Sequence, residues 1–179
     1  SGILVNDGGK TYGSEWADVD NDGDLDIVIT NQSGNNNRLY LNNGDATFTS
    51  ATTEVVSTDG GSSRGCSVVD YDNDGDLDIF IANRSNENNF LYQNDGNGNF
   101  AQITAGYIAN DGGNSHGSAW GDFDNDGWLD LYVTNDQEQA NFLYINILLV
   151  VDENKSRLST IRFPNKAKSR PVVNLFTVS

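Results

Sequence analysis

The sequence contains no methionine, a single cysteine, a single histidine and only two prolines among its 179 residues. One cysteine excludes an internal disulfide and a zinc cluster made of thiolates. Lysine and arginine are also scarce: ten of them face 26 aspartates and glutamates, which leaves a formal net charge of −16. Since nucleic acids and anionic membrane surfaces attract positive charge, this balance argues against both as partners and suits a protein that collects cations.

Long hydrophobic runs are missing as well. No apolar stretch reaches roughly 18 residues, so we expect no membrane-spanning helix. The residues from Ser1 onward show no basic stretch followed by an apolar one, so any secretion signal is missing or was removed. Hydrophobic residues make up only 36% of the chain, but 19 glycines and 8 Phe, 7 Tyr and 3 Trp indicate a folded protein with many tight turns.

What the sequence has in abundance is aspartate, concentrated in a nine-residue segment that occurs three times. The segments span Asp18–Asp26, Asp70–Asp78 and Asp122–Asp130, so the offset is 52 residues both times. Other positions keep the same register, including Asp-Gly-Gly triplets, single glycines and Leu-Tyr pairs. Three copies without an insertion or deletion indicate repeated structural units.

Each unit has the pattern of short β-strands. In the first unit an apolar stretch at residues 14–19 precedes the aspartate segment, and a β-branched run at 25–30 follows it. Residues 38–41 predict a third strand, and a fourth begins near 47–49, after a hairpin-turn sequence at 42–45. Helical periodicity is absent. Because four short strands in about 50 residues are the content of one β-propeller blade, we predict an all-β protein of three four-stranded blades.

The aspartate segment has the pattern D-x-D-x-D-G-x-L-D, which suits Ca²⁺, a hard cation that takes six to eight oxygen ligands. Carboxylates at positions 1, 3 and 5 can converge on one point if the backbone wraps around it, and Gly at position 6 permits that turn. The Asp at position 9 then closes the site. We therefore expect about three Ca²⁺ ions, one per loop. The predicted side-chain ligands are Asp18, Asp20, Asp22 and Asp26 in the first loop, Asp70, Asp72, Asp74 and Asp78 in the second, and Asp122, Asp124, Asp126 and Asp130 in the third.

Position 7 of the loop varies, since it holds Asp24, Asp76 and Trp128. An indole cannot replace a carboxylate ligand, so we predict that this position coordinates Ca²⁺ through its backbone carbonyl. An EF-hand is excluded because position 12 is Ile or Val within a predicted strand, where that motif needs Glu. Zinc would require His or Cys in the loops, and Mg²⁺ prefers fewer protein ligands and more water.

A plainer alternative is that the segments are Asn-Asp-Gly turns with solvated charges. Four carboxylates within nine residues repel one another, and a turn alone would not need them in every repeat. We therefore favour metal binding. Because the site recurs in each unit, we expect the ion to be structural rather than regulatory.

Residues 1–146 resemble the FG-GAP/VCBS-type repeats, which are related to the blades of the integrin α-subunit propeller. The resemblance rests on the D-x-D-x-D-G-x-L-D motif, the apolar strand after it and a later Phe-Leu-Tyr or Arg-Leu-Tyr strand. It implies one Ca²⁺ loop per blade, held by the twelve aspartates named above. It also implies a secreted or cell-surface protein that acts in adhesion, in carbohydrate binding or beside an enzyme. Since such propellers close with about seven blades, we expect these three to belong to a longer propeller, an open arc or a piece that self-associates.

The repeat register ends after Asn146. Residues 147–179 hold six of the ten Lys and Arg, both prolines and only two acidic residues. We treat this segment as a basic tail of unknown role. It is a strand that closes the last blade, a linker, or a segment outside the fold.

Together these features predict an extracellular calcium-binding repeat module, secreted or at the cell surface, for adhesion or for binding a protein or glycan ligand. We expect no enzymatic activity, because no nucleophile–base or acid–base pair stands apart from the metal loops. The alternative is a catalytic or non-catalytic propeller of a secreted polysaccharide-degrading enzyme, which a carboxylate pair lining a shared pocket outside the loops would favour. A purely structural array is a further alternative.

A few other residues carry weaker expectations. Trp16 and Trp120 are expected to pack in the core or between blades rather than form a sugar platform. Asn31 and Asn83 begin N-glycosylation triplets within polar loops that are able to hydrogen-bond glycans. The lone histidine, His116, occupies a variable repeat position and is set aside as a catalytic residue.

Overall fold

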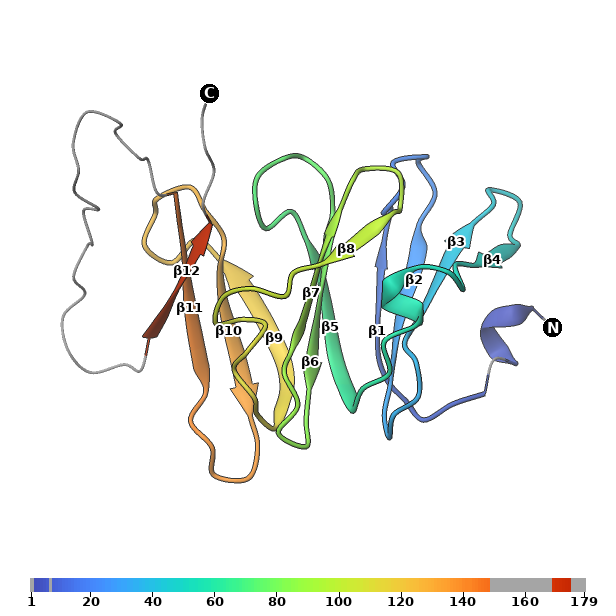
Figure 1. The fold of residues 1–179 in the computed structure, drawn as a ribbon. Coiled ribbons are helices and arrows are strands. Elements are labelled where there is room, and N and C mark those ends of the chain that lie inside the picture. Colours follow the sequence, from blue (N-terminus) through green and yellow to red (C-terminus); the bar gives the residue numbers. More distant parts are fainter. Residues whose placement is uncertain (1, 7, 149–168, 175–179) are drawn as a thin grey trace.

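The computed structural model describes residues 2–6, 8–148 and 169–174. Within these ranges the chain forms twelve strands and two 3₁₀ turns, η1 (Ile3–Val5) and η2 (Val55–Ser57), with no α-helix. The strands make three four-stranded sheets, which Figure 1 shows side by side in chain order. The predicted all-β fold of three blade-type sheets is therefore confirmed. No helix in the described ranges is long and apolar enough to cross a membrane.

The first blade consists of β1 (Thr11–Ala17), β2 (Asp26–Asn31), β3 (Arg38–Asn42) and β4 (Phe48–Ser50), paired antiparallel in that order. It differs from the sequence prediction at the strand ends. β1 ends at Ala17, so Val19 lies in the aspartate loop, where its N–H donates to the Asp26 carboxylate instead of to a neighbouring strand. β2 begins at Asp26 rather than at Leu25.

The second blade repeats this arrangement with β5 (Ser63–Val69), β6 (Asp78–Asn83), β7 (Phe90–Asn94) and β8 (Phe100–Gln102). The strand register repeats as well: Ile27 lies opposite Tyr40 in the first blade, and Ile79 lies opposite Tyr92 in the second. The 52-residue period of the sequence is thus a period of the structure.

The third blade consists of β9 (Ser115–Gly121), β10 (Asp130–Asn135), β11 (Phe142–Leu148) and β12 (Ser169–Asn174). β12 comes from the basic tail and pairs with β11, but it runs parallel to it, whereas β4 and β8 are antiparallel to their neighbours. The described part of the tail thus adds a fourth strand to the last sheet, and the role of the tail as a whole stays open. Residues 149–168 and 175–179 lie outside the described residues.

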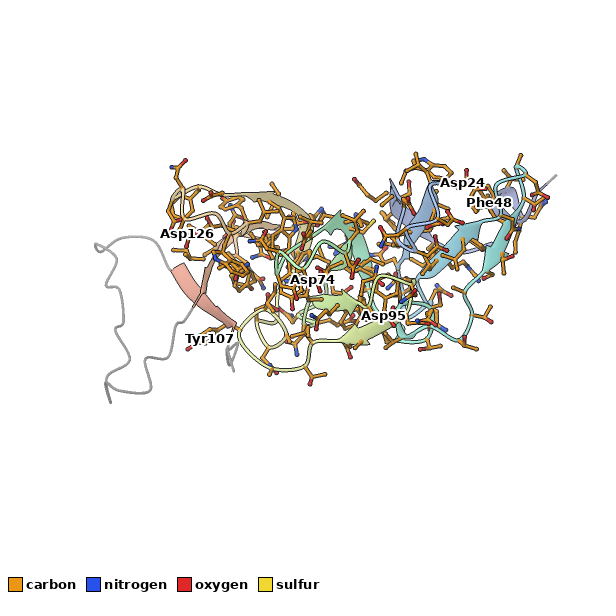
Figure 2. All side chains as sticks on the ribbon, turned by 90° about the horizontal axis from the view of Figure 1, so that it is seen from above. Asp24, Phe48, Asp74, Asp95, Tyr107 and Asp126 are labelled. Carbon is orange, nitrogen blue, oxygen red and sulfur yellow. The ribbon has the colours of Figure 1, made fainter. Side chains whose placement is uncertain are left out.

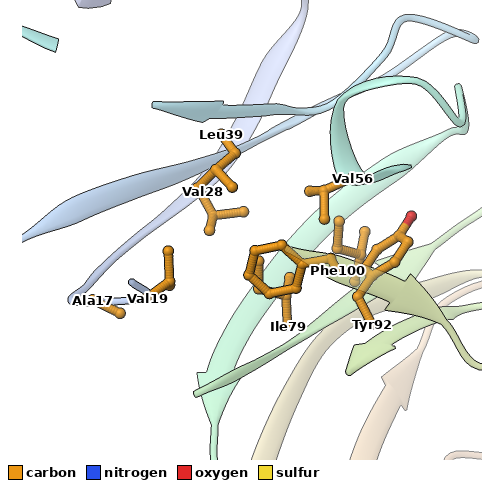
Figure 3. Packing of buried hydrophobic residues seen from close by; sticks show 9 residues of the cluster. Ala17, Val19, Val28, Leu39, Val56, Ile79, Tyr92 and Phe100 are labelled. Atoms are coloured by element: carbon orange, nitrogen blue, oxygen red, sulfur yellow. The ribbon is translucent and has the colours of Figure 1, made fainter. Parts of the chain in front are cut away.

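A hydrophobic cluster joins the first blade to the second. Val28 and Leu39 of the first blade meet Ile79 and Tyr92 of the second, and Val56 of η2 closes the side, as Figure 3 shows. All five side chains are almost fully buried. Since each such aliphatic or aromatic side chain contributes about 1.5–3 kcal/mol on burial, the contact between blades is a main source of stability.

An equivalent cluster joins the second blade to the third. It contains Phe80 and Leu91 from the second blade and Leu131 and Tyr144 from the third. Trp120 packs edge-on against Phe80, with ring centroids 6.1 Å apart, so its predicted place between blades is confirmed. The same prediction is wrong for Trp16, which is 51% exposed and contacts Phe48 of its own blade.

The first strands of adjacent blades, β1, β5 and β9, approach one another very closely. A Cβ atom on Gly13 of β1 would lie 2.7 Å from the carbonyl oxygen of Arg64 on β5. The same atom on Gly65 would lie 2.7 Å from the carbonyl oxygen of His116 on β9. Strand contact thus explains the glycine in the first two repeats, whereas the third copy, Gly117, has only Thr134 Oγ1 nearby, at 3.7 Å.

Candidate metal centres

Each aspartate segment forms a loop between the first two strands of its blade. We call these the first loop (Asp18–Asp26), the second loop (Asp70–Asp78) and the third loop (Asp122–Asp130). In the first loop the Asp18 carboxylate accepts the backbone N–H groups of Asp22 and Gly23, at 3.1 and 3.0 Å. The same pair of bonds recurs in the other two loops. The two hydrogen bonds therefore hold the loop backbone in a curve around the position 1 carboxylate.

The backbone conformation explains the Asn-Asp-Gly sequence within the loops. Asn21 at position 4 has φ of 60° and Gly23 at position 6 has φ of 96°, and the other loops repeat these values closely. Asn tolerates the left-handed region better than most residues, and glycine enters it without steric cost. The two residues thus allow the double bend that turns the aspartates toward one point.

The structure brings together three of the four predicted side-chain ligands in each loop, and leaves Asp26, Asp74 and Asp126 outside the clusters. In each loop three aspartates offer oxygens that all lie within 4.8 Å of one another. Figure 2 labels one aspartate from each loop, Asp24, Asp74 and Asp126, and shows the loops distributed over the three blades. The clusters are Asp18, Asp20 and Asp22 in the first loop, Asp70, Asp72 and Asp78 in the second, and Asp122, Asp124 and Asp130 in the third. Positions 1, 3, 5 and 9 each contribute to at least one cluster.

The position 9 aspartates have a second role that the sequence did not reveal. Both oxygens of Asp78 accept backbone N–H groups, one from Tyr71 at 3.1 Å and one from Asn94 at 2.9 Å. Asp26 and Asp130 make the equivalent two bonds. Each of these buried carboxylates therefore fastens its loop to the third strand of its blade.

The position 7 side chains belong to no carboxylate cluster. The Asp76 carboxylate instead accepts the Asn21 side-chain amide of the neighbouring loop at 3.1 Å, and it lies against Gly96 of the β7–β8 hairpin. Coordination through the backbone carbonyls of Asp24, Asp76 and Trp128 stays a prediction.

Burial and mutual repulsion raise the pKa of several loop carboxyls. Burial raises the pKa of Asp78 to about 7, and the negative charges of Asp72 and Asp74 add to the rise. Burial is also the main cause of the raised pKa of Asp20, Asp26, Asp72 and Asp130. Among the described residues, the charged groups that shift these pKa values are other loop aspartates, so the negative charge is not balanced from within the loops.

The carboxylate of Asp72 in the second loop has surroundings that could not be predicted from the nine residues of the loop. Gln93 of β7 donates from Nε2 to Oδ2 of Asp72 at 2.6 Å. The other oxygen of Asp72, Oδ1, is buried and has no hydrogen-bond partner. Gln93 could not have been found from the repeat, because its equivalents are Leu41 and Ile145.

The two asparagines that begin the glycosylation triplets lie inside the protein rather than on its surface. Asn31 and Asn83 are fully buried, and their side-chain amides donate to the backbone carbonyls of Asn36 and Asn88. A glycan cannot be attached to these nitrogens in the folded protein, so the two glycosylation triplets are not usable acceptor sites there.

Three four-stranded sheets lie side by side, and each carries one acidic loop. This arrangement defines a repeat protein of propeller-type blades. A comparison with family models matches the FG-GAP-like repeat at residues 18–81 and again at residues 70–133. Each match runs from one aspartate loop to the strand that follows the next. The chain belongs to the FG-GAP-like repeat family.

A similarity to one curated protein extends over more of the chain. Mouse cartilage acidic protein 1 is 32% identical over 143 residues, which cover 74% of this chain and 22% of that protein. The chain thus spans about a fifth of the length of that relative.

Proposed function

We propose that this chain is a non-enzymatic calcium-binding module of an extracellular protein, in which one Ca²⁺ per loop stiffens each blade. The observation that carries the proposal is Oδ1 of Asp72, a carboxylate oxygen that is buried without a partner inside a cluster of three carboxylates. Leaving such an oxygen unpaired in a protein interior is costly, and a cation supplies the missing partner.

The donor set favours calcium over other metals. All clustered ligands are carboxylate oxygens, which suit a hard cation, and the described loops contain no imidazole or thiolate for zinc. Asp70, Asp72, Asp74 and Asp78 would hold the ion in the second loop, together with the carbonyl of Asp76. The bound ion would offset the burial and the smaller mutual repulsion that raise the pKa of Asp72 and Asp78.

An extracellular setting fits this chemistry. Calcium sites of extracellular modules commonly have dissociation constants of about 10⁻⁴–10⁻³ M, so they fill where calcium is abundant and not in the cytosol. The family membership and the similarity to a cartilage protein support the same setting. With the ions bound, the module would act in adhesion or in binding a protein or glycan ligand.

The described residues outside the loops do not favour a catalytic role. One polar hollow that the described residues form is lined by asparagines, serines, threonines, Gly34 and Arg38, and it contains no acidic side chain. His116 forms an ion pair with Asp136 at 3.2 Å on an exposed surface. The carboxylate pair in a shared pocket that would indicate a polysaccharide-degrading enzyme is thus missing from this hollow.

The two outer blade faces expose side chains whose equivalents are buried or partly buried between blades. Phe123 and Tyr132 of the third blade are 55% and 43% exposed, and Trp16 and Leu25 of the first are 51% and 54% exposed. We propose that a further blade packs on these faces, supplied by a second copy when the chain is alone. Sedimentation should show self-association that Tyr132→Lys weakens, and a monomer at high concentration would contradict this.

Calorimetric titration of metal-free protein with Ca²⁺, Mg²⁺ and Zn²⁺ tests the metal site. We expect about three Ca²⁺ per chain, weaker Mg²⁺ binding and no specific Zn²⁺ binding. Asp72→Asn should remove one Ca²⁺, while the control Asp45→Asn, which changes an exposed hairpin aspartate outside the loops, should remove none. Absence of calcium uptake by the unaltered chain would overturn the proposal.

A further inference from the structure

A line of buried hydrogen bonds connects the three loops across the blade boundaries. Its crossing residues are Asn94 and Asn146, the last residue of β7 and its equivalent in β11, which are 4% and 3% exposed. Neither residue belongs to an aspartate loop. Both contact a loop of the preceding blade as well as the loop of their own blade.

The first crossing joins the first and second loops. Asn94 donates from Nδ2 to the Val19 carbonyl at 2.7 Å and to the Leu77 carbonyl at 2.9 Å. Its backbone N–H donates to Oδ1 of Asp78, the position 9 carboxylate of the second loop. On the other side, the N–H of Val19 donates to Oδ2 of Asp26, the position 9 carboxylate of the first loop. Two predicted ligands of different ions are thus linked through two residues.

The second crossing repeats the first between the second and third loops. Asn146 donates from Nδ2 to the Tyr71 carbonyl at 2.7 Å, and its N–H donates to Asp130 at 2.9 Å. The N–H of Tyr71 donates to Asp78. The line therefore runs without interruption from Asp26 through Asp78 to Asp130.

We propose that Asn94 and Asn146 couple the three calcium sites, so that an ion bound in one loop raises the affinity of the adjacent loops. This inference rests on the proposed calcium binding. The element with two states is the loop itself: it is wrapped when the ion is bound, and relaxed by carboxylate repulsion when the ion is absent. The carbonyls of Val19 and Tyr71 are held at the asparagine amides only in the wrapped state.

The coupling follows from the cost of ordering. When the second loop binds its ion, Asp78 fixes the backbone of Tyr71, and the Tyr71 carbonyl then holds the Asn146 side chain. Asn146 is thereby placed with its N–H toward Asp130, so the third loop loses less conformational freedom when it binds. Coupling between binding sites is reciprocal, so the third ion favours the second by the same factor.

A second line of contacts runs along the exposed rim. Asn21 donates to Asp76 and to the Gly96 carbonyl, and Asn73 donates to the Gly127 carbonyl at 3.0 Å. Because these bonds are exposed, water can replace them, and their contribution is small. The buried asparagines are therefore the positions to change.

The third loop offers a site-specific signal, because Trp128 lies within it. Tb³⁺ bound in that loop should show luminescence sensitised by Trp128, and competition with Ca²⁺ then gives the calcium affinity of the third site alone. Trp128→Phe should remove the signal without removing binding, which assigns the signal to this loop. The protein used is the full 179-residue chain.

Four forms of the chain test the coupling: unaltered, Asp72→Asn, Asn146→Ala and the double variant. Emptying the second site with Asp72→Asn should weaken the third site about fivefold or more, the lower range of typical coupling. Asn146→Ala should weaken it similarly. In the Asn146→Ala background, Asp72→Asn should have no further effect on the third site.

Asn42→Ala is the matched control. Asn42 is the equivalent residue of the first blade, and its side chain donates to Leu25 of its own blade without a cross-blade partner among the described residues. Asn42→Ala should leave the calcium affinity of the third site unchanged. If Asn146→Ala does not fold, Asn146→Ser replaces it in the same cycle.

The outcomes separate the two proposals. If the unaltered chain binds neither Tb³⁺ nor Ca²⁺, calcium binding and coupling both fail. If it binds calcium but Asp72→Asn leaves the third site unchanged, or weakens it equally with and without Asn146, the coupling through Asn146 is wrong and calcium binding stands.

Discussion

The second and third loops have nearly the same sequence and very different surroundings. They differ only at positions 2 and 7, where Tyr71 and Asp76 correspond to Phe123 and Trp128. Tyr71 is 6% exposed and Phe123 is 55% exposed. The exposure differs because the third blade covers the second loop, whereas no described blade covers the third loop.

This difference shows that a repeated motif does not define a repeated environment. Asp72 is buried and contacts Gln93, whereas its equivalent Asp124 is exposed. The pKa of Asp78 rises to about 7 because of burial, which is the condition a bound cation would relieve most. We therefore expect the second loop to respond to calcium and to mutation more strongly than the third.

Calcium removal should have the largest effect on stability. Each ion that binds only the folded state adds RT ln(1 + [L]/Kd), about 2.7 kcal/mol at a hundredfold excess over Kd. Thermal unfolding followed by circular dichroism should shift to lower temperature in chelator and recover with Ca²⁺ but not with Na⁺. An unchanged melt in excess chelator would mean that the loops are only turns.

Substitution of the position 9 aspartate should destabilise the protein more in the second loop than in the third. Asp78→Ala leaves the N–H groups of Tyr71 and Asn94 buried without acceptors and should cost about 2–4 kcal/mol in urea unfolding. Asp130→Ala should cost about half as much, because the bond from the Phe123 N–H is only partly buried and water can replace it. Equal costs would show that the covering blade does not matter.

The fold of each blade could be predicted from the sequence because its signals are local. Strand alternation, the hairpin turns and the Asn-Asp-Gly bends act within a few residues, so the repeat of the motif gave the repeat of the structure. The approach of three aspartates in each loop follows from the same local signals, whereas the fourth predicted ligand of each loop lies outside its cluster. The recurring Asn42, Asn94 and Asn146 were also visible in the sequence and could have indicated a shared role.

The remaining features depend on contacts between distant residues. The partner of Asn94 is Val19, 75 residues away, and no pattern within one repeat indicates it. Gln93 contacts Asp72 only because β7 passes beside the second loop. The parallel pairing of β12 with β11 also joins segments that share no repeat register, so the sequence left the tail undecided.

The pH dependence of the calcium-free protein should reflect Asp78. Its folded pKa of about 7 lies above the ordinary value of 3.8, so the folded state binds the proton more tightly than the unfolded state. Stability in chelator should therefore rise as the pH falls from about 7 toward 3.8. Asp78→Asn should flatten this rise in urea unfolding curves. The increment from Ca²⁺ should shrink over the same range, since protons compete for the ligands.

Substitutions at position 7 should have the smallest effect. Asp76→Ala removes an exposed bond to Asn21 and should keep second-loop calcium binding, with a stability loss of about 0.5 kcal/mol or less. Trp128→Asp should keep binding in the third loop. Calorimetry checks both, and a loss of binding in Asp76→Ala as severe as in Asp78→Ala would refute coordination through the backbone.

Diffraction from crystals grown with calcium tests the central claim most directly, because it places the ion and its ligands. The account predicts one ion in each loop, contacting Oδ1 of Asp72 in the second loop together with the carbonyl of Asp76. It also predicts the highest occupancy there when calcium is limiting. A water molecule or a protein donor on Oδ1 of Asp72, with no ion in the loop at saturating calcium, would contradict it.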